Sequence, residues 1–420
     1  EIGTGDWSSD VCSSDLWGSP KFVEEQFTQW YRRNAGTVPA PIDIRHREFA
    51  FLTFRGRGMH RHIALPTLKD LHGYLRNNAP MHAYHSSSYY DNPTADMSQK
   101  GWLGADLVFD IDADHFDLPC QEIHDKWWCR NCDEEGMGHH PEICVCGKAQ
   151  FDSETWLCGD CLQATKYETQ KLLDILIQDF GTKIEDLITN FSGNRGYHVH
   201  VHSDIMKSLN QNSRREIVDY IMATGLEAGL QGFKPGKGSR STLAEGGWRG
   251  RTGRAVYDYL TSATEREIRD LKMSRNATQV VLKSRDEVLD TLMTKHPSNI
   301  LPMIPPKQLD KLVAKAIKLQ ASEIDTVVTT DIHRLIRMPN TLHGKTGWQV
   351  QTIPYGKLPN YDPLMRAVVL EGHNVELEFK GAPKIKILGE TYGPYGEEDV
   401  TMPVGAALFF LCKKGARVKK

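Results

Sequence analysis

Long apolar runs are missing from this sequence, and so is any marked excess of one charge. The 420 residues contain no stretch of about 18 uncharged apolar residues, so we expect no membrane-spanning helix. The formal net charge of −3 argues against a protein that grips nucleic acid over its whole surface, although local basic patches still permit binding. With 40% hydrophobic and 25% charged residues, the composition is that of an ordinary globular protein with one large domain or two modest ones.

Cysteine is scarce outside one short segment. Seven of the nine cysteines fall between Cys120 and Cys161, and only Cys12 and Cys412 lie elsewhere. A disulfide framework would be spread through a small secreted chain, whereas clustering in a larger chain is typical of metal binding. We therefore expect a reducing, cytoplasmic environment.

The first sixteen residues differ from the rest of the chain. They lack an initiator methionine and the basic-plus-apolar pattern of a signal peptide, and they are rich in Ser, Asp and Gly. They resemble translated adaptor sequence. We interpret residues 1–16 as a non-native or disordered tail and leave Cys12 out of the fold.

Hydrophobic periodicity predicts a mixed α/β (α+β) chain. Helical patterns cover residues 20–33, 162–180 and 307–320, and capping boxes at Ser213 and Thr264 open further helices, the first ending near residue 230. Alternation predicts strands at 47–54, 105–112, 190–203, 326–337 and 348–353. Residues 231–254 hold six Lys or Arg, one acidic residue and many glycines, which predicts a mobile basic loop.

Paired carboxylates end one of the predicted strands. In LVFDID, Asp110 and Asp112 point the same way and are separated by about 6.6 Å along the strand. Two such carboxylates repel each other unless a cation lies between them, and two-metal phosphoryl transfer uses this pair with a third carboxylate. Asp325 is a candidate third member, with Asp331 as its rival. Spacing alone does not exclude Asp114 and His115 as additional ligands.

Two further segments suit a bound phosphate. SGNRGYH at 192–198 combines glycines, a hydroxyl and Arg195, so that backbone N–H groups, an O–H and a guanidinium can face one anion. HRLIRMPNTLHGK at 333–345 places Arg337 and His343 on either side of a Pro-Asn turn. Basic residues beside a carboxylate group are what a metal-bound triphosphate requires. Taken singly, either segment also fits a polar surface turn.

Read together and in order, four motifs resemble the small, catalytic subunit of archaeal and eukaryotic replicative DNA primases. They are REF with a following Arg61, FDID at 109–112, SGNRGYH at 192–198, and RLIRMPNTLHGKTG at 334–347, where Thr341 replaces the usual Ser. The resemblance runs from about residue 39 to 352. It implies the primase fold, with a mixed or antiparallel catalytic sheet, a small helical subdomain at about 205–320 and an inserted zinc-binding module.

The same resemblance implies roles for individual residues. The third metal aspartate of the family precedes the last motif, which selects Asp325 over Asp331. Asp110, Asp112 and Asp325 would then hold two Mg²⁺ or Mn²⁺ ions. The incoming triphosphate would be bound by Arg61, Ser192, Gly193, Arg195, Gly196, His198, Arg337 and His343.

Cysteine spacing separately predicts bound zinc. Paired cysteines occur at 129/132, 144/146 and 158/161, and Cys120 with His124 completes eight ligands, enough for two tetrahedral sites. The family pattern implies one site from Cys120, His124, Cys158 and Cys161. The inner four, Cys129, Cys132, Cys144 and Cys146, would form a second. A zinc ribbon that pairs Cys129 and Cys132 with Cys158 and Cys161 fits the spacing nearly as well. His139 and His140 are alternative candidates for a ligand position.

The resulting prediction is a nucleotidyltransferase that makes short RNA or DNA primers on single-stranded DNA. Its domains would be a catalytic part at 17–119, the zinc module at 120–161 and the remainder at 162–420. Nucleoside triphosphates, a template and a separate large subunit would be its partners, near the nucleoid and without a membrane. The alternatives are a stand-alone primase-polymerase of the same superfamily and a non-catalytic zinc-ribbon protein that binds nucleic acid.

Overall fold

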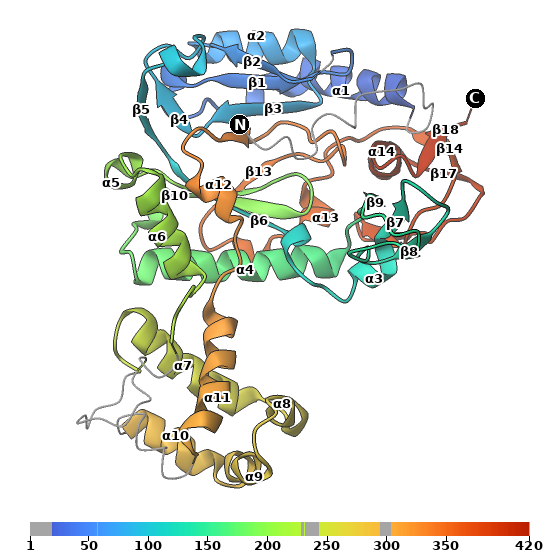
Figure 1. Ribbon diagram of the computed structural model, residues 1–420. Coiled ribbons are helices and arrows are strands. Elements are labelled where there is room, and N and C mark those ends of the chain that lie inside the picture. The colour runs from blue at the N-terminus through green and yellow to red at the C-terminus, as the bar shows by residue number, and fades with distance from the viewer. Residues whose placement is uncertain (1–18, 57, 228–230, 232–242, 295–303, 420) are drawn as a thin grey trace. The chain divides into compact units, whose positions relative to one another are not determined.

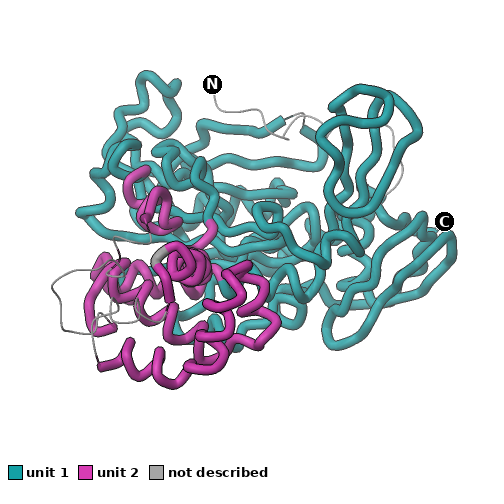
Figure 2. Tube along the Cα trace, turned by 60° about the horizontal axis from the view of Figure 1, so that its bottom comes forward, with its two compact units in different colours: residues 1–167, 185–214, 324–420 teal, residues 168–184, 215–323 magenta. Residues whose placement is uncertain are grey.

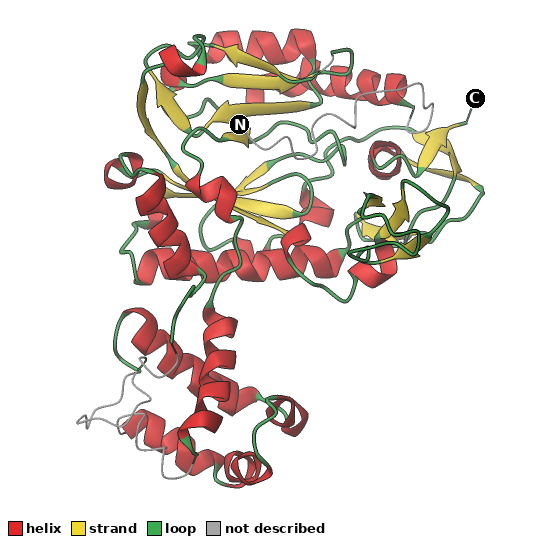
Figure 3. Cartoon of the chain, viewed as in Figure 1, coloured by secondary structure: helices red, strands yellow, loops and turns green. Residues whose placement is uncertain are grey.

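The computed structural model describes residues 19–56, 58–227, 231, 243–294 and 304–419. The chain divides into two compact units (Figure 2). Unit 1 comprises residues 1–167, 185–214 and 324–420, and unit 2 comprises residues 168–184 and 215–323. Strands belong to unit 1, whereas the described part of unit 2 is helical (Figure 3). No helix among the described residues is both long and apolar enough to cross a bilayer.

The first sheet of unit 1 is antiparallel with the order β12-β3-β1-β2. Its strands are β1 (Phe49–Leu52), β2 (His60–Ile63), β3 (His82–Ser86) and β12 (Leu335–Arg337). Helices α1 (Pro20–Asn34) and α2 (Leu68–Asn78) lie along this sheet (Figure 1). Phe51 is fully buried and stacks on Tyr74 of α2 at a ring separation of 4.2 Å, so aromatic packing holds helix and sheet together.

The second sheet carries the FDID motif and has the order β13-β10-β11-β6. Its strands are β6 (Leu107–Asp112), β10 (Leu187–Phe191), β11 (Gly196–Val201) and β13 (Gln351–Ile353). The antiparallel register sets His198 opposite Asp110 and Gly196 opposite Asp112. A Cβ at position 196 would collide with the backbone carbonyl of Ile111, so this close pairing requires glycine.

A buried ion pair links the beginning of β6 to the first sheet. The Arg47 guanidinium donates to the carbonyls of Ser86 and Ser87 at 2.9 and 2.7 Å and to Asp106 Oδ2 at 2.5 Å. Tyr89 Oη donates to the other Asp106 oxygen at 2.7 Å. The two charged side chains are 0% and 3% exposed, and these hydrogen bonds compensate their removal from water.

Arg47→Ala should therefore destabilise the protein strongly. It leaves the Asp106 carboxylate buried and without its cation, which typically costs about 3–5 kcal/mol in the free energy of unfolding. Arg417→Ala is the matched control, because its pair with Glu378 is 40% and 37% exposed and should contribute about 1 kcal/mol or less. Calorimetric unfolding of both variants checks this, and equal losses would contradict it.

A second buried arginine, from later in the chain, binds the two residues that precede β6. Arg214 is 1% exposed, and its guanidinium donates to the carbonyls of Ala105 at 2.7 Å and Asp106 at 2.9 Å. It lies in α6 (Gln211–Ile221) and is the last residue of unit 1 before the chain enters unit 2 for the second time. The chain returns to unit 1 at Ile324.

The remaining strands of unit 1 form small antiparallel sheets. They are β4 (Ser88–Tyr90) with β5 (Trp102–Ala105); β8 (Glu135–Met137), β7 (Lys126–Cys129) and β9 (Phe151–Glu154); β17 (Asp399–Pro403), β14 (Asn374–Phe379) and β18 (Ala416–Val418); and β15 (Ile385–Ile387) with β16 (Glu390–Tyr392). Short helices are α3 (Gln121–His124), α5 (Asp204–Lys207), α12 (Thr326–Thr330), α13 (Pro363–Arg366) and the buried α14 (Val404–Cys412).

Unit 2 has its own apolar core. Its helices are α7 (Gly247–Ser262), α8 (Glu265–Asp270), α9 (Arg275–Lys283), α10 (Arg285–Thr294) and α11 (Pro306–Gln320), with the later parts of α4 (Gly159–Gln178) and α6. Fully buried side chains from four of these helices pack together, among them Val256, Val281, Leu292 and Leu312. Arg251 of α7 also pairs with Asp179, directly after α4, at 2.6 Å.

The predicted fold class and the main helices are confirmed. The chain is a mixed α/β protein with antiparallel sheets, and α1, α4 and α11 cover the segments predicted to be helical. The Thr264 capping box is formed in both directions, with the Thr264 side chain accepting from Glu267 N and the Glu267 side chain accepting from Thr264 N.

Two predicted strands are wrong. Residues 326–337 begin as helix α12, because the Asp325 side chain accepts from the N–H groups of Val327 and Val328 and caps a helical turn despite the β-branched sequence. Only Leu335–Arg337 is a strand. Residues 190–203 are a hairpin rather than one strand, since β10 ends at Phe191 and β11 begins at Gly196. The other strands are shorter than predicted, with a break at Asp106.

Two predictions on helix α6 and the basic loop also need correction. Asn210, not Ser213, caps α6, since its Oδ1 accepts from Ser213 N at 3.0 Å, and the helix ends at Ile221. Helix α7 begins at Gly247, so the second half of the predicted basic loop is largely helical. Residues 232–242 of the predicted basic loop, like the tail at 1–16, lie outside the described residues.

Candidate active site and metal centres

Three carboxylates lie near one another at the end of β6, although their oxygens are not all within 4.8 Å of one another. Asp110 and Asp112 project from the same face of the strand, and Asp325 is held beside them because its backbone N–H donates to the Asp110 carbonyl at 2.8 Å. One Asp325 oxygen accepts from Val327 N at 2.8 Å, and the other lies 4.0 Å from His115 Nε2. Asp331 instead accepts from His333 N at 2.8 Å. Neither Asp325 nor Asp331 is among the residues that line the cleft described below, but the charge of Asp325 acts on Asp110.

The electrostatics of this cluster favour a cation. Burial, followed by the neighbouring charges of Asp112 and Asp325, raises the pKa of Asp110 to about 8, against the opposing effect of Arg334 and Arg337. A divalent ion would relieve this repulsion, and carboxylate oxygens are the ligands that Mg²⁺ and Mn²⁺ prefer. The donor set therefore fits the hard divalent cations that the motif predicts.

The turn between β10 and β11 lies beside the carboxylates. Ser192 Oγ accepts from the backbone N–H groups of Asn194 and Gly196, both at 3.3 Å, and this holds the turn closed. Gly193 has a φ of +82°, and a Cβ there would approach the His343 Cβ to 2.8 Å. The absence of a side chain at this position lets the turn pack against the HGK segment.

A cleft opens between the carboxylates and a basic wall. It is lined by Tyr84, Asp110, Asp112, Ser192, Asn194, His198, Arg334, Leu335, Ile336, Arg337 and His343. Burial and, next to it, the charge of Arg337 lower the pKa of His198 to about 3 and that of His343 well below its usual range. Both imidazoles are therefore neutral at physiological pH, and Arg334 and Arg337 supply the positive charge of this wall.

Arg337 is positioned from the first sheet. Its Nη1 contacts His82 Nδ1 at 2.6 Å, and the same ring nitrogen lies 3.2 Å from the donating Gly344 N. His198 in turn lies on β11 with its Nε2 at 3.5 Å from Asp110 Oδ1. Cleft-lining side chains from both sheets are thus held toward one space.

Arg195 is engaged by acidic residues. Its guanidinium forms an ion pair with Asp114, and its Nε lies 3.5 Å from Asp112 Oδ1. Arg195 lies beside the cleft and is not among the residues that line it, and the same holds for Arg61 on β2. Arg61 donates to the buried Glu48 carboxylate at 3.1 Å, and Lys100 donates to the same carboxylate.

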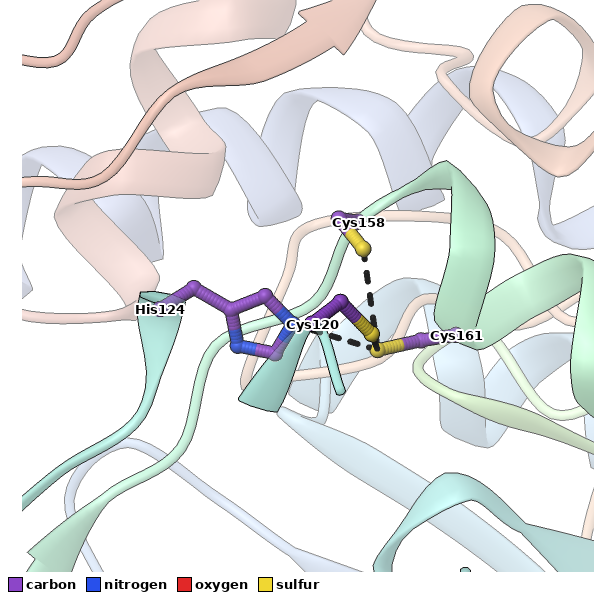
Figure 4. A group of neighbouring side chains, drawn as sticks. All are labelled: Cys120, His124, Cys158 and Cys161. Atoms are coloured by element: carbon purple, nitrogen blue, oxygen red, sulfur yellow. Dashed lines mark hydrogen bonds between the residues drawn. The ribbon is translucent and has the colours of Figure 1, made fainter. Parts of the chain in front are cut away.

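The outer four cysteine-segment ligands converge on one point. Cys120, His124, Cys158 and Cys161 point toward one another (Figure 4). Cys161 Sγ lies 3.5 Å from Cys120 Sγ, 3.8 Å from Cys158 Sγ and 3.2 Å from His124 Nε2. A tetrahedral zinc with bonds of roughly 2.3 Å requires sulfur atoms about 3.8 Å apart.

Asp125 orients the histidine of this group. Its Oδ1 lies 2.8 Å from His124 Nδ1 and accepts from Trp156 N at 2.8 Å. The contact leaves His124 Nε2 directed at the sulfur atoms, an arrangement that fixes the ring of a metal-binding histidine. The donor set fits zinc.

The inner four cysteines form a second group. Cys129 Sγ lies 3.7 Å from Cys146 Sγ, and Cys132 Sγ lies 3.5 Å from Cys144 Sγ. The eight residues are therefore divided as in the nested arrangement and not as in the ribbon. His140 stacks on Phe151, and neither His139 nor His140 is in either group.

The sequence is similar to known proteins over nearly its whole length. The sequence model described as DNA primase small subunit matches residues 138–353. A DNA primase small subunit PriS from Nitrosopumilus maritimus is 30% identical over 95% of this chain and 98% of its own length. Those from Cenarchaeum symbiosum and Methanoregula boonei are 31% and 32% identical, covering 93% and 95% of this chain and 96% and 98% of their own.

The chain belongs to the DNA primase small subunit family.

Membership confirms the family resemblance that four short motifs indicated. The structure gathers around one cleft the primase motif residues Asp110, Asp112, Ser192, His198, Arg337 and His343, with Asp325 alongside.

Several residues around these sites were not predicted from the sequence. Tyr84, Asn194 and Arg334 line the cleft, and Asp125 orients His124. Arg334 and Asn194 lie inside quoted motifs, and Asp125 follows a predicted ligand, so each had a local signal. Tyr84 had none, because its place in the cleft depends on pairing between β3 and β12.

Proposed function

We propose that this chain is the catalytic subunit of a DNA primase, which synthesises short RNA or DNA primers on single-stranded DNA by nucleotidyl transfer. The observation that carries the proposal is the cleft in which Asp110 and Asp112, with Asp325 beside them, face Arg334 and Arg337. One wall is suited to metal ions and the other to phosphates, the combination that nucleotidyl transfer requires.

In this proposal Asp110, Asp112 and Asp325 hold two Mg²⁺ or Mn²⁺ ions. When bound, the ions activate the attacking 3′-hydroxyl and stabilise the pyrophosphate that leaves. The Asp325 backbone bond to Asp110 keeps the third carboxylate next to the first two.

The triphosphate would be held by the turn and the basic wall. Ser192, Gly193 and Gly196 bring a hydroxyl and backbone N–H groups to the phosphates, and His198 and His343 add neutral imidazole donors. Arg195 and Arg337 supply charge. Arg61, which is paired with Glu48, would act indirectly by supporting the first sheet.

The two cysteine groups would bind zinc as structural sites. Each has four protein ligands and therefore no open position for a reactant. We further propose a large subunit as the partner, since the relatives are named small subunits, together with a DNA template and nucleoside triphosphates.

Primer synthesis by the purified chain tests the function. We expect labelled oligomers on a poly(dT) template with ATP and Mg²⁺ or Mn²⁺, and none with CTP, because synthesis follows the template. Asp325→Ala should yield no product, whereas the exposed control Asp96→Ala should match the wild type.

Adding the large subunit separates the alternatives. Efficient synthesis by the chain alone, with no gain from the partner, would favour a stand-alone primase-polymerase. Failure with every nucleotide, metal and partner would contradict the proposal and favour a non-catalytic zinc protein that binds nucleic acid.

A further inference from the structure

Arg195, a proposed phosphate ligand, already has an anionic partner in the protein. It lies in the turn between β10 and β11 with a side chain only 10% exposed. Its Nη2 donates to Asp114 Oδ2. Its Nε is buried without a hydrogen-bond partner and lies 3.5 Å from Asp112 Oδ1. The guanidinium thus faces two carboxylates, and one of its donors remains available.

Asp114 differs from the carboxylates of the proposed metal site. It lies after β6 in the single turn Ala113–His115, where its backbone N–H donates to Asp112 Oδ1 at 3.2 Å. Its side chain is 44% exposed, so its own charge can rotate into water, whereas Arg195 is 10% exposed and then needs another anion. Asp114 can therefore release Arg195 when a phosphate takes its place.

The surroundings of Arg195 carry further positive charge. Lys413, whose Nζ donates to the Thr155 carbonyl at 3.0 Å, has a pKa lowered to about 7, first by burial and then by the charges of Arg195 and Lys345. Asp114 and Asp112 are the acidic groups that act on Lys413 in the opposite direction. Anionic charge at this position is thus favoured whether it comes from the protein or from a ligand.

We propose that Asp114 is an internal counter-ion that competes with the nucleotide phosphates for Arg195 and so sets nucleotide affinity. The inference rests on the proposed function, since it assumes that the anion is a polyphosphate. On binding, a phosphate oxygen replaces the Asp114 carboxylate at Arg195, and Asp114 turns into solvent. Asp114 is then a positioning residue that keeps Arg195 oriented before the nucleotide arrives and weakens binding by competition.

Asp114→Asn should tighten polyphosphate binding. Removing the competing charge should lower the KM for nucleotide, and the inhibition constant of inorganic tripolyphosphate, by about two- to fivefold, the range of a partly exposed ion pair. The kcat should change by less than about twofold. Asp114→Glu, which keeps the charge, should stay near the wild type, and Asp117→Asn, at a side chain 99% exposed, is the matched control.

A double-mutant cycle identifies the partner. In an Arg195→Ala background, Asp114→Asn should leave tripolyphosphate affinity unchanged, because the guanidinium for which Asp114 and phosphate compete is gone. A raised or unchanged KM for Asp114→Asn with a normal melting temperature would overturn the inference. A collapse of kcat would overturn it too, since Asp114 would then be a metal ligand.

Direct binding of tripolyphosphate keeps this test separate from the proposed function. Titration needs no template and no synthesis. Tighter binding by Asp114→Asn in a protein that makes no primers would refute the primase proposal and leave the counter-ion intact. Primer synthesis by Asp114→Asn with unaltered tripolyphosphate affinity would refute the counter-ion inference and leave the primase proposal intact.

Discussion

Asp110→Ala should reduce primer synthesis by at least about 10³-fold, the scale on which phosphoryl transfer depends on charge stabilisation at the transferring group. The variant loses a carboxylate on which the charges of both Asp112 and Asp325 act. The Asp110 backbone carbonyl accepts from Asp325 N, and its side chain shares a strand face with Asp112. Template-directed incorporation under single-turnover conditions measures the loss directly.

The same variant should be well folded. Removing a carboxylate that burial and two neighbouring charges disfavour relieves repulsion in the metal-free protein, so the melting temperature should not fall. Asp96→Ala, at an exposed position, controls for the loss of one negative charge. An Asp110→Ala protein that is folded and retains more than a tenth of wild-type activity would exclude Asp110 as an essential ligand.

Proton release should accompany metal binding at this cluster. The pKa of Asp110 is raised to about 8, so below that pH the group is mainly protonated in the metal-free protein and a metal ion must displace the proton. Apparent Mg²⁺ affinity should therefore increase as pH rises toward 8 and then level off. Calorimetric titration in buffers of different ionisation enthalpy counts the protons, and Asp110→Asn should abolish the release.

Loss of the outer cysteine site should destabilise the protein more than loss of the inner one. Cys161 is 1% exposed and lies in the first turn of α4. Asp125, which orients His124 of the same site, accepts from the N–H of Trp156, and Trp156 packs against Phe409 and Phe410 of α14. Cys161→Ser should release one zinc and cost several kcal/mol, because a structural site contributes its binding free energy to folding. Removal of all zinc by exhaustive chelation should unfold the protein almost completely.

The inner site provides the matched comparison. Cys146 is exposed, and its group belongs to the β7–β9 segment. Cys146→Ser should also lower the zinc content from two ions to one, but with a smaller shift of the melting temperature. Metal analysis and calorimetry on the same samples decide the matter. One zinc in the wild type, or equal shifts for both variants, would contradict the two-site assignment.

Local signals predicted much of the fold. The LVFDID alternation placed Asp110 and Asp112 on one face of a strand, and Thr264 with Glu267 marked a helix start, because both depend on neighbours in the chain. Asp325 was predicted on a strand from β-branched residues, yet its own side chain caps a helix. Here two hydrogen bonds accepted by one side chain outweighed the propensities of five β-branched residues.

Contacts between distant segments were beyond local reasoning. The REF motif marked Arg47 only as part of a resemblance, and its partner Asp106 lies 59 positions away. Arg61 matched a family motif, but the acidic side chain that it meets, Glu48, is set by the pairing of β1 with β2. Which charges neutralise one another depends on strand register, and spacing alone does not determine it.

The longer segment of unit 2, residues 215–323, is flanked in the sequence by residues that bind β6 or the two residues before it. Where the chain leaves unit 1, Arg214 grips the carbonyls of Ala105 and Asp106, and just after its return Asp325 N binds the Asp110 carbonyl. Residues 215–323 thus begin and end beside attachment points on β6 or on the residues directly before it. Because both attachment points belong to unit 1, we expect insertions and deletions within residues 215–323 to leave the spacing of Asp110 and Asp325 unchanged.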